Sequence, residues 1–226
     1  MKRYTAIATV ALAAASCVFV FVHREELGLT GSRSLASAAS QAIDDAAPAL
    51  RTVRISWQPI DRPGDGFKVE MPEDPRQLQV PAYNESGVSE PVNMVFSSPD
   101  GGTTYAVAWA DNPPSMRLEN HVPDATLDAA RDGLLARTQT QVVSETRCEP
   151  QGFPGRDVLA RNVGGGVMDA RFIVAGRRLY LLTAAYPTIG ARREQDVKHF
   201  FNSFAVTDTS SIAQAQPGAA ARGARP

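Results

Sequence analysis

The sequence is short of the residues from which metal sites and disulfide frameworks are built. It holds 2 cysteines and 3 histidines among 226 residues. Cys17 lies in an apolar segment near the N-terminus, so Cys148 stands alone in the rest of the chain and the folded domain has no intramolecular disulfide available. The three histidines lie far apart in the sequence, so they do not form the group of three or four neighbouring ligands that a metal site needs. We therefore predict no cofactor and no metal ion.

Charge of either sign is not in excess. The chain carries 23 Lys and Arg against 24 Asp and Glu, which gives a formal net charge of −1. A nearly neutral chain has no general attraction for nucleic acid or for anionic lipid. Nucleic acid is therefore not an expected partner.

The motifs of nucleophilic and phosphate chemistry are also absent. No Gly-x-Ser-x-Gly elbow occurs. The run Gly164-Gly165-Gly166 lacks the Lys-Ser/Thr pair of a phosphate-binding loop, and a predicted strand follows it where such a loop needs a helix. Glycine takes positive φ at little cost, so glycine-rich links between strands are typical of hairpin turns. We interpret this run as a hairpin turn and predict that the protein is not an enzyme.

What the sequence does contain is an export signal. Lys2 and Arg3 precede residues 6–22, an unbroken run of small and apolar side chains. The run is at the short end of the roughly 17 to 25 residues that span a bilayer. The two basic residues predict that the N-terminus stays in the cytoplasm while the rest of the chain crosses. We therefore favour an uncleaved single-pass anchor in a bacterial cytoplasmic membrane, with the C-terminal domain extracytoplasmic.

Two other forms of this signal remain open. A lipoprotein signal would use Cys17, which small residues precede, but the apolar residues 18–22 lie where a newly exported chain should be polar. A cleaved signal peptide would leave a secreted or periplasmic protein. Small residues are missing directly after the apolar run, and Ala36-Ser37-Ala38 is a small-x-small match far downstream.

Composition divides the chain into four parts. Residues 1–26 form the membrane anchor or signal segment, and residues 27–52, rich in Ala and Ser, are expected to be a flexible stalk. Residues 53–207 contain the patterned segments of one domain. Residues 208–226 offer almost nothing to bury, so we predict a disordered tail.

The domain is predicted to have an α+β fold. Helical spacing indicates helices at 124–138, with Asp124 as the N-cap, and near 193–202. An antiparallel β-sheet with helices packed on it, on both faces or mostly on one, follows from the order of the segments. The predicted strands are 66–71, 92–97, 103–110, 141–149, a strand after residues 152–157, 167–175 and 179–185.

Alternation within the strands predicts their faces. In 167–175 the apolar even positions lie opposite Asp169 and Arg171, and in 103–110 large odd positions alternate with alanine. Residues 179–182 are large and apolar at every position. A strand of that kind is covered on both sides.

Two sets of side chains are candidate ligand-binding residues. An arginine patch would grip a carboxylate or phosphate, although interleaved acids favour ordinary ion pairs. An aromatic pocket would take a small molecule or a lipid, although strand positions favour core packing. The arginines are Arg156, Arg161, Arg171, Arg177, Arg178, Arg192 and Arg193, of which Arg156 follows a Pro-Gly turn and is predicted to pair with a carboxylate. The aromatics are Trp57, Tyr105, Trp109, Tyr180 and Tyr186.

Single titratable residues give no catalytic site. His121 and Asp111 form one candidate pair in a loop, whereas His199 is interpreted as a surface or boundary residue of a helix. Cys148, near the end of a strand, is interpreted as a small buried or half-buried residue and not as a nucleophile. No set of nucleophile, base and orienting group can be assembled. We assign no catalytic, cofactor-binding or metal-binding residue, and the ligand-binding residues stay unknown.

Several short motifs lie in an order that resembles a known superfamily. They are Val69-Glu70-Met71-Pro72 before Pro75, the helix at Asp124, Gly152-Phe153-Pro154-Gly155-Arg156, Arg177-Arg178-Leu179-Tyr180 and Phe200-Phe201-Asn202-Ser203-Phe204. This order resembles the PsbP-like superfamily, in particular its uncharacterised exported bacterial domains, over about residues 57–206. The resemblance implies an α/β/α sandwich with an interaction or accessory role. It carries over no functional residue, because the family has no common site.

These observations predict a membrane-anchored extracytoplasmic domain that is not an enzyme and that binds a protein partner. The partner would bind at a sheet edge or at the loop 112–123, and the N-terminal segment would anchor the protein in the membrane. The alternative is a small-molecule or lipid-binding module that uses the aromatic or arginine-lined face. An unrecognised hydrolase is the third hypothesis.

Overall fold

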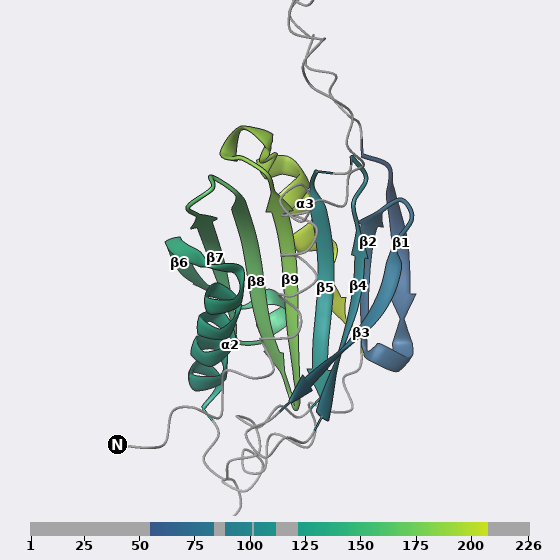
Figure 1. Ribbon diagram of the computed structural model, residues 1–226. Helices are drawn as coiled ribbons and strands as arrows, with labels where there is room; N and C mark the ends of the chain where they lie inside the picture. The colour runs from purple at the N-terminus through teal and green to yellow at the C-terminus, as the bar shows by residue number, and fades with distance from the viewer. Residues whose placement is uncertain (1–54, 84–88, 101, 112–121, 208–226) are drawn as a thin grey trace, which may run out of the picture.

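The computed structural model describes residues 55–83, 89–100, 102–111 and 122–207 (Figure 1). The predicted anchor, stalk and C-terminal tail, the loop 112–121 and His121 lie outside the described residues. Within the described ranges, no helix is long and apolar enough to cross a membrane.

A seven-stranded antiparallel sheet forms the centre of the domain, in the order β3-β4-β5-β9-β8-β7-β6 (Figure 1). The strands β7, β8 and β9 are joined by consecutive hairpins, which confirms the predicted meander. The bounds are β3 (Arg76–Tyr83), β4 (Ser89–Ser97), β5 (Thr104–Asp111), β6 (Thr140–Cys148), β7 (Gly155–Asn162), β8 (Val167–Ala175) and β9 (Arg178–Tyr186).

The glycine run makes the turn between β7 and β8. Asn162 N donates to Gly166 O at 2.9 Å, and the Asn162 side-chain oxygen accepts from Gly166 N at 2.7 Å. Gly165 has φ +90°, a backbone conformation that residues other than glycine rarely adopt. The hairpin interpretation of this run is confirmed.

A second sheet of three strands was not predicted. It has the order β1-β2-β10 and lies beside β4, with the 3₁₀ turn η1 (Pro63–Asp65) between its first two strands. β10 is only two residues long and pairs with β2 from the far end of the chain. Such a short strand leaves no pattern in the sequence. Its members are β1 (Trp57–Arg62), β2 (Phe67–Pro72) and β10 (Ala205–Val206).

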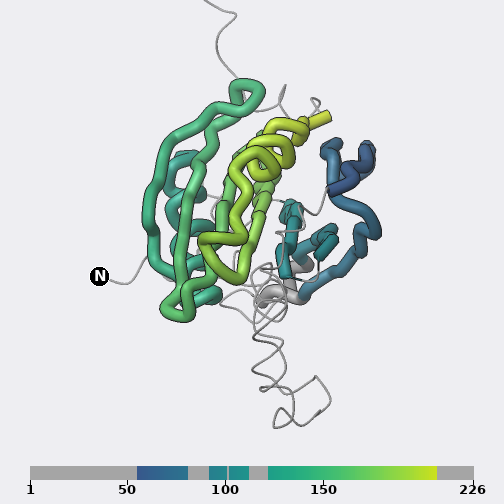
Figure 2. Tube along the Cα trace, turned by 90° about the horizontal axis from the view of Figure 1, so that it is seen from above, coloured from purple at the N-terminus to yellow at the C-terminus, as the bar shows by residue number. Residues whose placement is uncertain are grey.

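The helices α2 (Pro123–Thr138) and α3 (Glu194–Ser203) lie on opposite faces of the large sheet (Figure 2). The predicted N-cap of α2 is wrong, because Val122 is the cap, Pro123 follows at the first helical position and Asp124 lies inside the first turn. Proline at that position loses no hydrogen bond, and an acid in the first turn favours the helix dipole. Two further 3₁₀ turns are η3 (Pro150–Gly152) and η4 (Ile189–Ala191).

Two apolar cores form on the two faces of the sheet. The even positions of β8 join Leu127 and Leu134 of α2 on one side. On the other side Tyr180 and Leu182 of β9 join Phe200 of α3 and the strand β2. This arrangement confirms the predicted α+β class, an antiparallel sheet with helices packed on it, and the strand β9 that is covered on both faces.

The second face is covered unevenly. α2 packs on β6, β7 and β8, whereas on the opposite face α3 and the small sheet leave β6 and β7 open (Figure 2). The open part of that face and the free edge of β6 are therefore the surfaces on which a function can be sought.

Candidate functional site

The strand β6 is the exposed edge of the large sheet. Gln139 ends α2 in a left-handed conformation with φ 51°, and β6 begins at the next residue, beneath the helix. Residues 141–147 are exposed, and Val142 and Val143 have exposed fractions of 42% and 58%. An edge strand directs alternate N–H and C=O groups away from its neighbour, and these groups are ready to pair with another chain.

The two edges of the sheet are not equivalent. Pro81 interrupts the edge strand β3, where it offers no N–H, and Arg62 of the small sheet donates to Gln77 of this strand at 3.1 Å. β6 contains no proline, and its register with β7 is shifted once, between Val142 and Ser144. From Ser144 to Cys148 the edge is regular, so β6 is the better docking edge.

A groove of about 420 Å³ lies beside this edge, between the sheet and α3. Its floor is formed by the side chains of β6, β7 and β8 that point toward α3, and its wall by α3. The polar and apolar residues that line it include Ser144, Thr146, Leu159, Val197, Phe201 and Asn202. The charged residues are Asp157, Asp169, Arg171, Arg192, Glu194 and Lys198.

The arginines of the groove are already paired. Arg171 donates to both carboxylate oxygens of Asp157 at 2.7 Å, and Arg192 donates to both of Asp169 at 2.8 Å. Arg171 also donates to Phe201 O at 3.2 Å, which ties β8 to the last turn of α3. Burial lowers the pKa of the Arg171 guanidinium, but hydrogen bonds to Asp157 outweigh it, so its pKa lies above the ordinary value. An anion entering the groove would have to displace an aspartate.

The predicted carboxylate partner of Arg156 is found on the other face. Its guanidinium contacts Asp124 at 3.1 Å and Glu145 at 2.8 Å, and also reaches Asp128. The Arg156 side chain is 6% exposed, whereas its three carboxylate partners are 26% to 49% exposed, so a buried guanidinium joins α2, β6 and β7. This pairing confirms the prediction for Arg156.

The arginines do not form one basic patch. Arg178 pairs with Asp111 at 2.5 Å at the β8-β9 hairpin, and Arg193 pairs with Asp196 at 2.7 Å at the start of α3. Arg171 and Arg178 therefore serve different contacts. The ion-pair interpretation is confirmed for five of the candidate arginines, whereas Arg161 is exposed on β7. The five are Arg156, Arg171, Arg178, Arg192 and Arg193.

The candidate aromatics fill the core. Tyr105, Trp109, Tyr180 and Tyr186 are each 2% exposed or less, and Trp57 packs against the same cluster. The hydroxyls of Tyr105 and Tyr186 lie 3.3 Å apart, so each phenol has a polar neighbour. Burial raises the pKa of Tyr105 to about 12. Core packing, the expected arrangement for these rings, is confirmed.

The remaining candidates give no catalytic set within the described residues. His199 is a boundary residue, as predicted: its side chain is 43% exposed, it contacts Glu70 at 2.6 Å, and its ring lies 4.6 Å from that of Trp57. Asp111 is engaged by Arg178. No group of three or more His, Cys, Asp or Glu side chains in the described ranges is arranged to hold a metal ion.

The Cys148 thiol is half-buried at the end of β6 and donates to Asp157 Oδ1 at 3.5 Å. Burial, together with the charge of Asp157, raises the pKa of Cys148 to about 12. A thiolate is the reactive form of cysteine, so this thiol is a poor nucleophile.

We therefore expect Cys148 to resist alkylation at pH 8 in the folded protein. The experiment uses the full chain with Cys17→Ser, treated with iodoacetamide and followed by mass spectrometry. Folded protein should react at least about 100-fold more slowly than the same chain in urea, where the thiol pKa returns to about 8.5. Equal rates in the two conditions would contradict the assignment.

Sequence reasoning did not single out the residues that border the edge and the groove. Ser144 and Thr146 are common surface residues in a strand of mixed pattern, and no motif in the sequence marks this strand as the edge of the sheet. The signal that exists is local. Residues 141–147 carry no alternation that would bury one face, and a strand exposed on both faces belongs at an edge.

Neither a family model nor a curated protein matches the sequence. Among solved structures, the domain is similar to cyanobacterial PsbP (CyanoP) from Synechocystis sp. PCC 6803, with a TM-score of 0.48 and 13% identity over 73% of this chain and 98% of that chain. A protein of unknown function from Pseudomonas aeruginosa, described as a putative regulator, is similar with a TM-score of 0.33 and 12% identity over 60% of this chain and 85% of that one. At these identities the likeness concerns the fold alone.

Proposed function

We propose that the protein is an extracytoplasmic accessory domain, held at the bacterial cytoplasmic membrane by residues 6–22, that binds a protein partner along the free edge of β6 and performs no catalysis itself. The observation that carries the proposal is the edge itself, in which seven consecutive residues of a nine-residue strand are exposed. Strand addition uses such an edge, because main-chain hydrogen bonds supply affinity and neighbouring side chains supply specificity.

The surroundings of the edge favour a protein over a small ligand. The aromatic side chains proposed for a lipid or small-molecule pocket are packed in the core. Of the arginines proposed for an anion site, the two that line the groove, Arg171 and Arg192, are held by Asp157 and Asp169. What stays accessible is main chain, two valines and the polar side chains beside them, which is the surface of a peptide-binding edge.

Photo-crosslinking tests the edge. A benzoylphenylalanine residue is placed at Thr146 of the full chain in its native membrane, with Leu78 of β3, 38% exposed on the opposite edge, as the matched position. We expect one adduct of defined mass from Thr146 and none from Leu78. Equal labelling at the two positions, or no adduct at Thr146, would refute the proposed edge.

The membrane attachment is tested separately by N-terminal analysis of the purified native protein. An uncleaved anchor predicts a chain that resists carbonate extraction and still contains residues 6–22. A mature N-terminus beyond Val22 would refute the anchor and support the cleaved signal.

A further inference from the structure

We propose that β6 pairs antiparallel with β6 of a second copy of this chain, in the register that places Thr146 opposite Thr146 of that copy. The inference rests on the proposed docking edge and names its partner. The pairing would join two seven-stranded sheets into one continuous sheet. Its two-fold axis would stand perpendicular to that sheet.

The symmetry restricts the register. A two-fold axis perpendicular to the sheet keeps each face on the same side in both copies, so opposed residues must point to the same face. The axis then passes through a residue. The regular part of the edge runs from Ser144 to Cys148, and Cys148 is the last residue of β6, so four residues remain as possible centres. They are Ser144, Glu145, Thr146 and Arg147.

Charge selects among these four centres. An axis at Glu145 or at Arg147 sets like charges directly against each other, which is destabilising. An axis at Ser144 extends the pairing across the irregular step beside Val143 and places no opposite charges together. An axis at Thr146 sets Glu145 opposite Arg147 twice, once on each side of the axis, and stays within the regular part of the strand.

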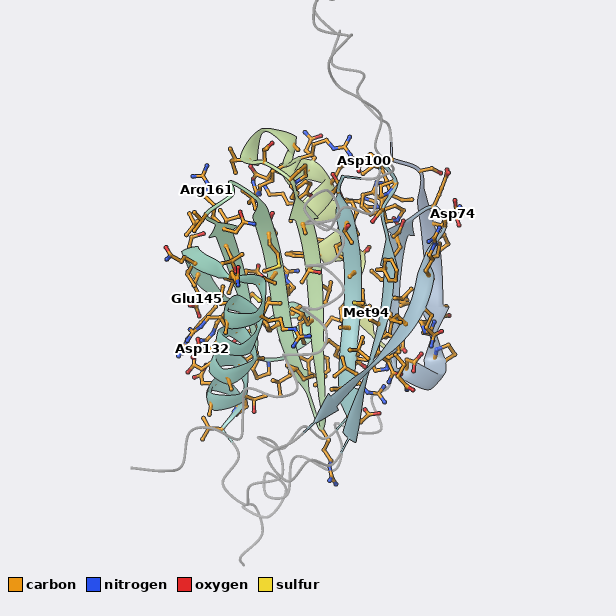
Figure 3. All side chains as sticks on the ribbon, viewed as in Figure 1. Asp74, Met94, Asp100, Asp132, Glu145 and Arg161 are labelled. Carbon is orange, nitrogen blue, oxygen red and sulfur yellow. The ribbon has the colours of Figure 1, made fainter. Side chains whose placement is uncertain are left out.

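The side chains of Glu145 and Arg147 can each make a further ion-pair contact. Arg147 is 79% exposed and has one ion-pair contact among the described residues, with Asp124 at 3.1 Å. Glu145 Oε1 accepts from Arg131 and also lies 2.8 Å from Arg156 Nη1, and Oε2 accepts from Arg131 at 2.9 Å. A carboxylate has about four acceptor positions, so Glu145 can accept one more hydrogen bond. Figure 3 shows Glu145 on the outer side of the domain, near Asp132 of α2.

The opposite face fits the same register. Thr146 points toward α3, as Asp157 does, so the two Thr146 side chains would meet on that face. A Thr-Thr cross-strand pair contributes favourably in antiparallel sheets. The two grooves would then open on the same face and share the Thr146 pair as their common border.

Charged residues on an edge usually prevent pairing with other chains. Here Glu145 and Arg147 match only a strand that presents the opposite order, and a second β6 presents it. Glu145 and Arg147 therefore favour pairing of β6 with a second β6 and disfavour pairing with most other edge strands.

Cysteine crosslinking tests both the pairing and its register. Thr146→Cys is introduced into the full chain with Cys17→Ser and Cys148→Ser, in membranes under mild oxidation. Directly opposed Cβ atoms lie about 4.5 to 5.5 Å apart in an antiparallel pair, close to the spacing of a disulfide. We expect a disulfide-linked dimer from Thr146→Cys and none from the matched variant Gln141→Cys, whose two copies would lie about 30 Å apart at about 3.3 Å per residue.

A charge reversal adds an independent readout. Arg147→Glu would oppose Glu145 of the second copy and should slow disulfide formation at position 146 at least fivefold. Arg161→Glu, at another exposed arginine, on β7, should leave the rate unchanged. A dimer that forms equally fast with Arg147→Glu would overturn the register, and a dimer from Gln141→Cys alone would do the same.

The photo-crosslinker at Thr146 separates the two proposals. An adduct at twice the chain mass of 24.2 kDa supports self-pairing. An adduct of another mass, with no disulfide dimer from a Thr146→Cys chain whose thermal unfolding matches its parent, refutes self-pairing and keeps the docking edge. The absence of both products refutes both proposals.

Discussion

Replacing Arg156 by methionine is expected to lower the free energy of unfolding by about 3 kcal/mol, the low end of the range for breaking a buried ion pair. The Arg156 side chain is 6% exposed and contacts Asp124, Asp128 and Glu145. Without the guanidinium these three carboxylates lose a shared cation at the junction of α2, β6 and β7. The low end applies because the carboxylates themselves are 26% to 49% exposed, so water compensates part of the loss.

Arg147→Met is the matched control for Arg156. Arg147 also contacts Asp124, but its side chain is 79% exposed. Exposed ion pairs contribute about 0 to 1 kcal/mol. Urea denaturation of the full chain in mild detergent, followed by tryptophan fluorescence, measures both variants. Similar losses of unfolding free energy for Arg156→Met and Arg147→Met would mean that the burial of Arg156 does not determine its contribution to stability.

A second-site change tests the mechanism of the Arg156 effect. Asp128→Asn removes one of the carboxylates that Arg156→Met leaves without its cation. The double variant should therefore be less destabilised than the sum of the two single variants, because the two residues interact directly. Strict additivity would place the Arg156 effect in packing of its alkyl chain instead.

Replacing Phe200 by alanine is expected to cost about 4 kcal/mol, within the range for truncating a buried phenylalanine. Phe200 is fully buried in α3, with its ring 5.4 Å from Tyr105 and 5.8 Å from Phe201. The truncation leaves a cavity at the junction of α3 and the sheet. The same unfolding experiment measures the loss, because Trp57 and Trp109 belong to this core.

His199→Ala is the control for Phe200, one position earlier in α3. Its side chain is 43% exposed, so its removal should cost less than about 1 kcal/mol, as for most surface substitutions. A loss at Phe200 no larger than the loss at His199 would contradict the assignment of the aromatic residues to the core.

The sequence predicted the fold where local pattern and tertiary environment agree. β8 has the predicted bounds, because its even positions face α2 and its turns contain glycine. β3 was missed because proline interrupts it and its first four residues, Arg76 to Gln79, are all exposed, so no buried face marks it. β10 was missed because two residues have no period.

The sequence predicted the type of contact, a sheet edge, but not the strand that forms it. A sheet edge was one expected contact, and the carboxylate partnership of Arg156 was expected by residue. The other expected contact, the loop 112–123, falls almost wholly outside the described residues. The choice of β6 over β3 came from the structure, since an edge is a property of strand order, and strand order depends on contacts between distant segments.

The sequence by itself determined the α+β class, the meander of β7, β8 and β9, the two faces of β8 and β9 and the pairing role of Arg156. Each of these depends on a period, a turn residue or a charge that the chain carries locally. The tertiary structure alone decided that β6 ends the sheet and that a groove opens beside it. It also decided that the side chains of Glu145 and Arg147 lie on the face of β6 that α2 covers. These features depend on where α2 and α3 pack, and packing is set by the summed burial of many side chains, which no single stretch of sequence contains.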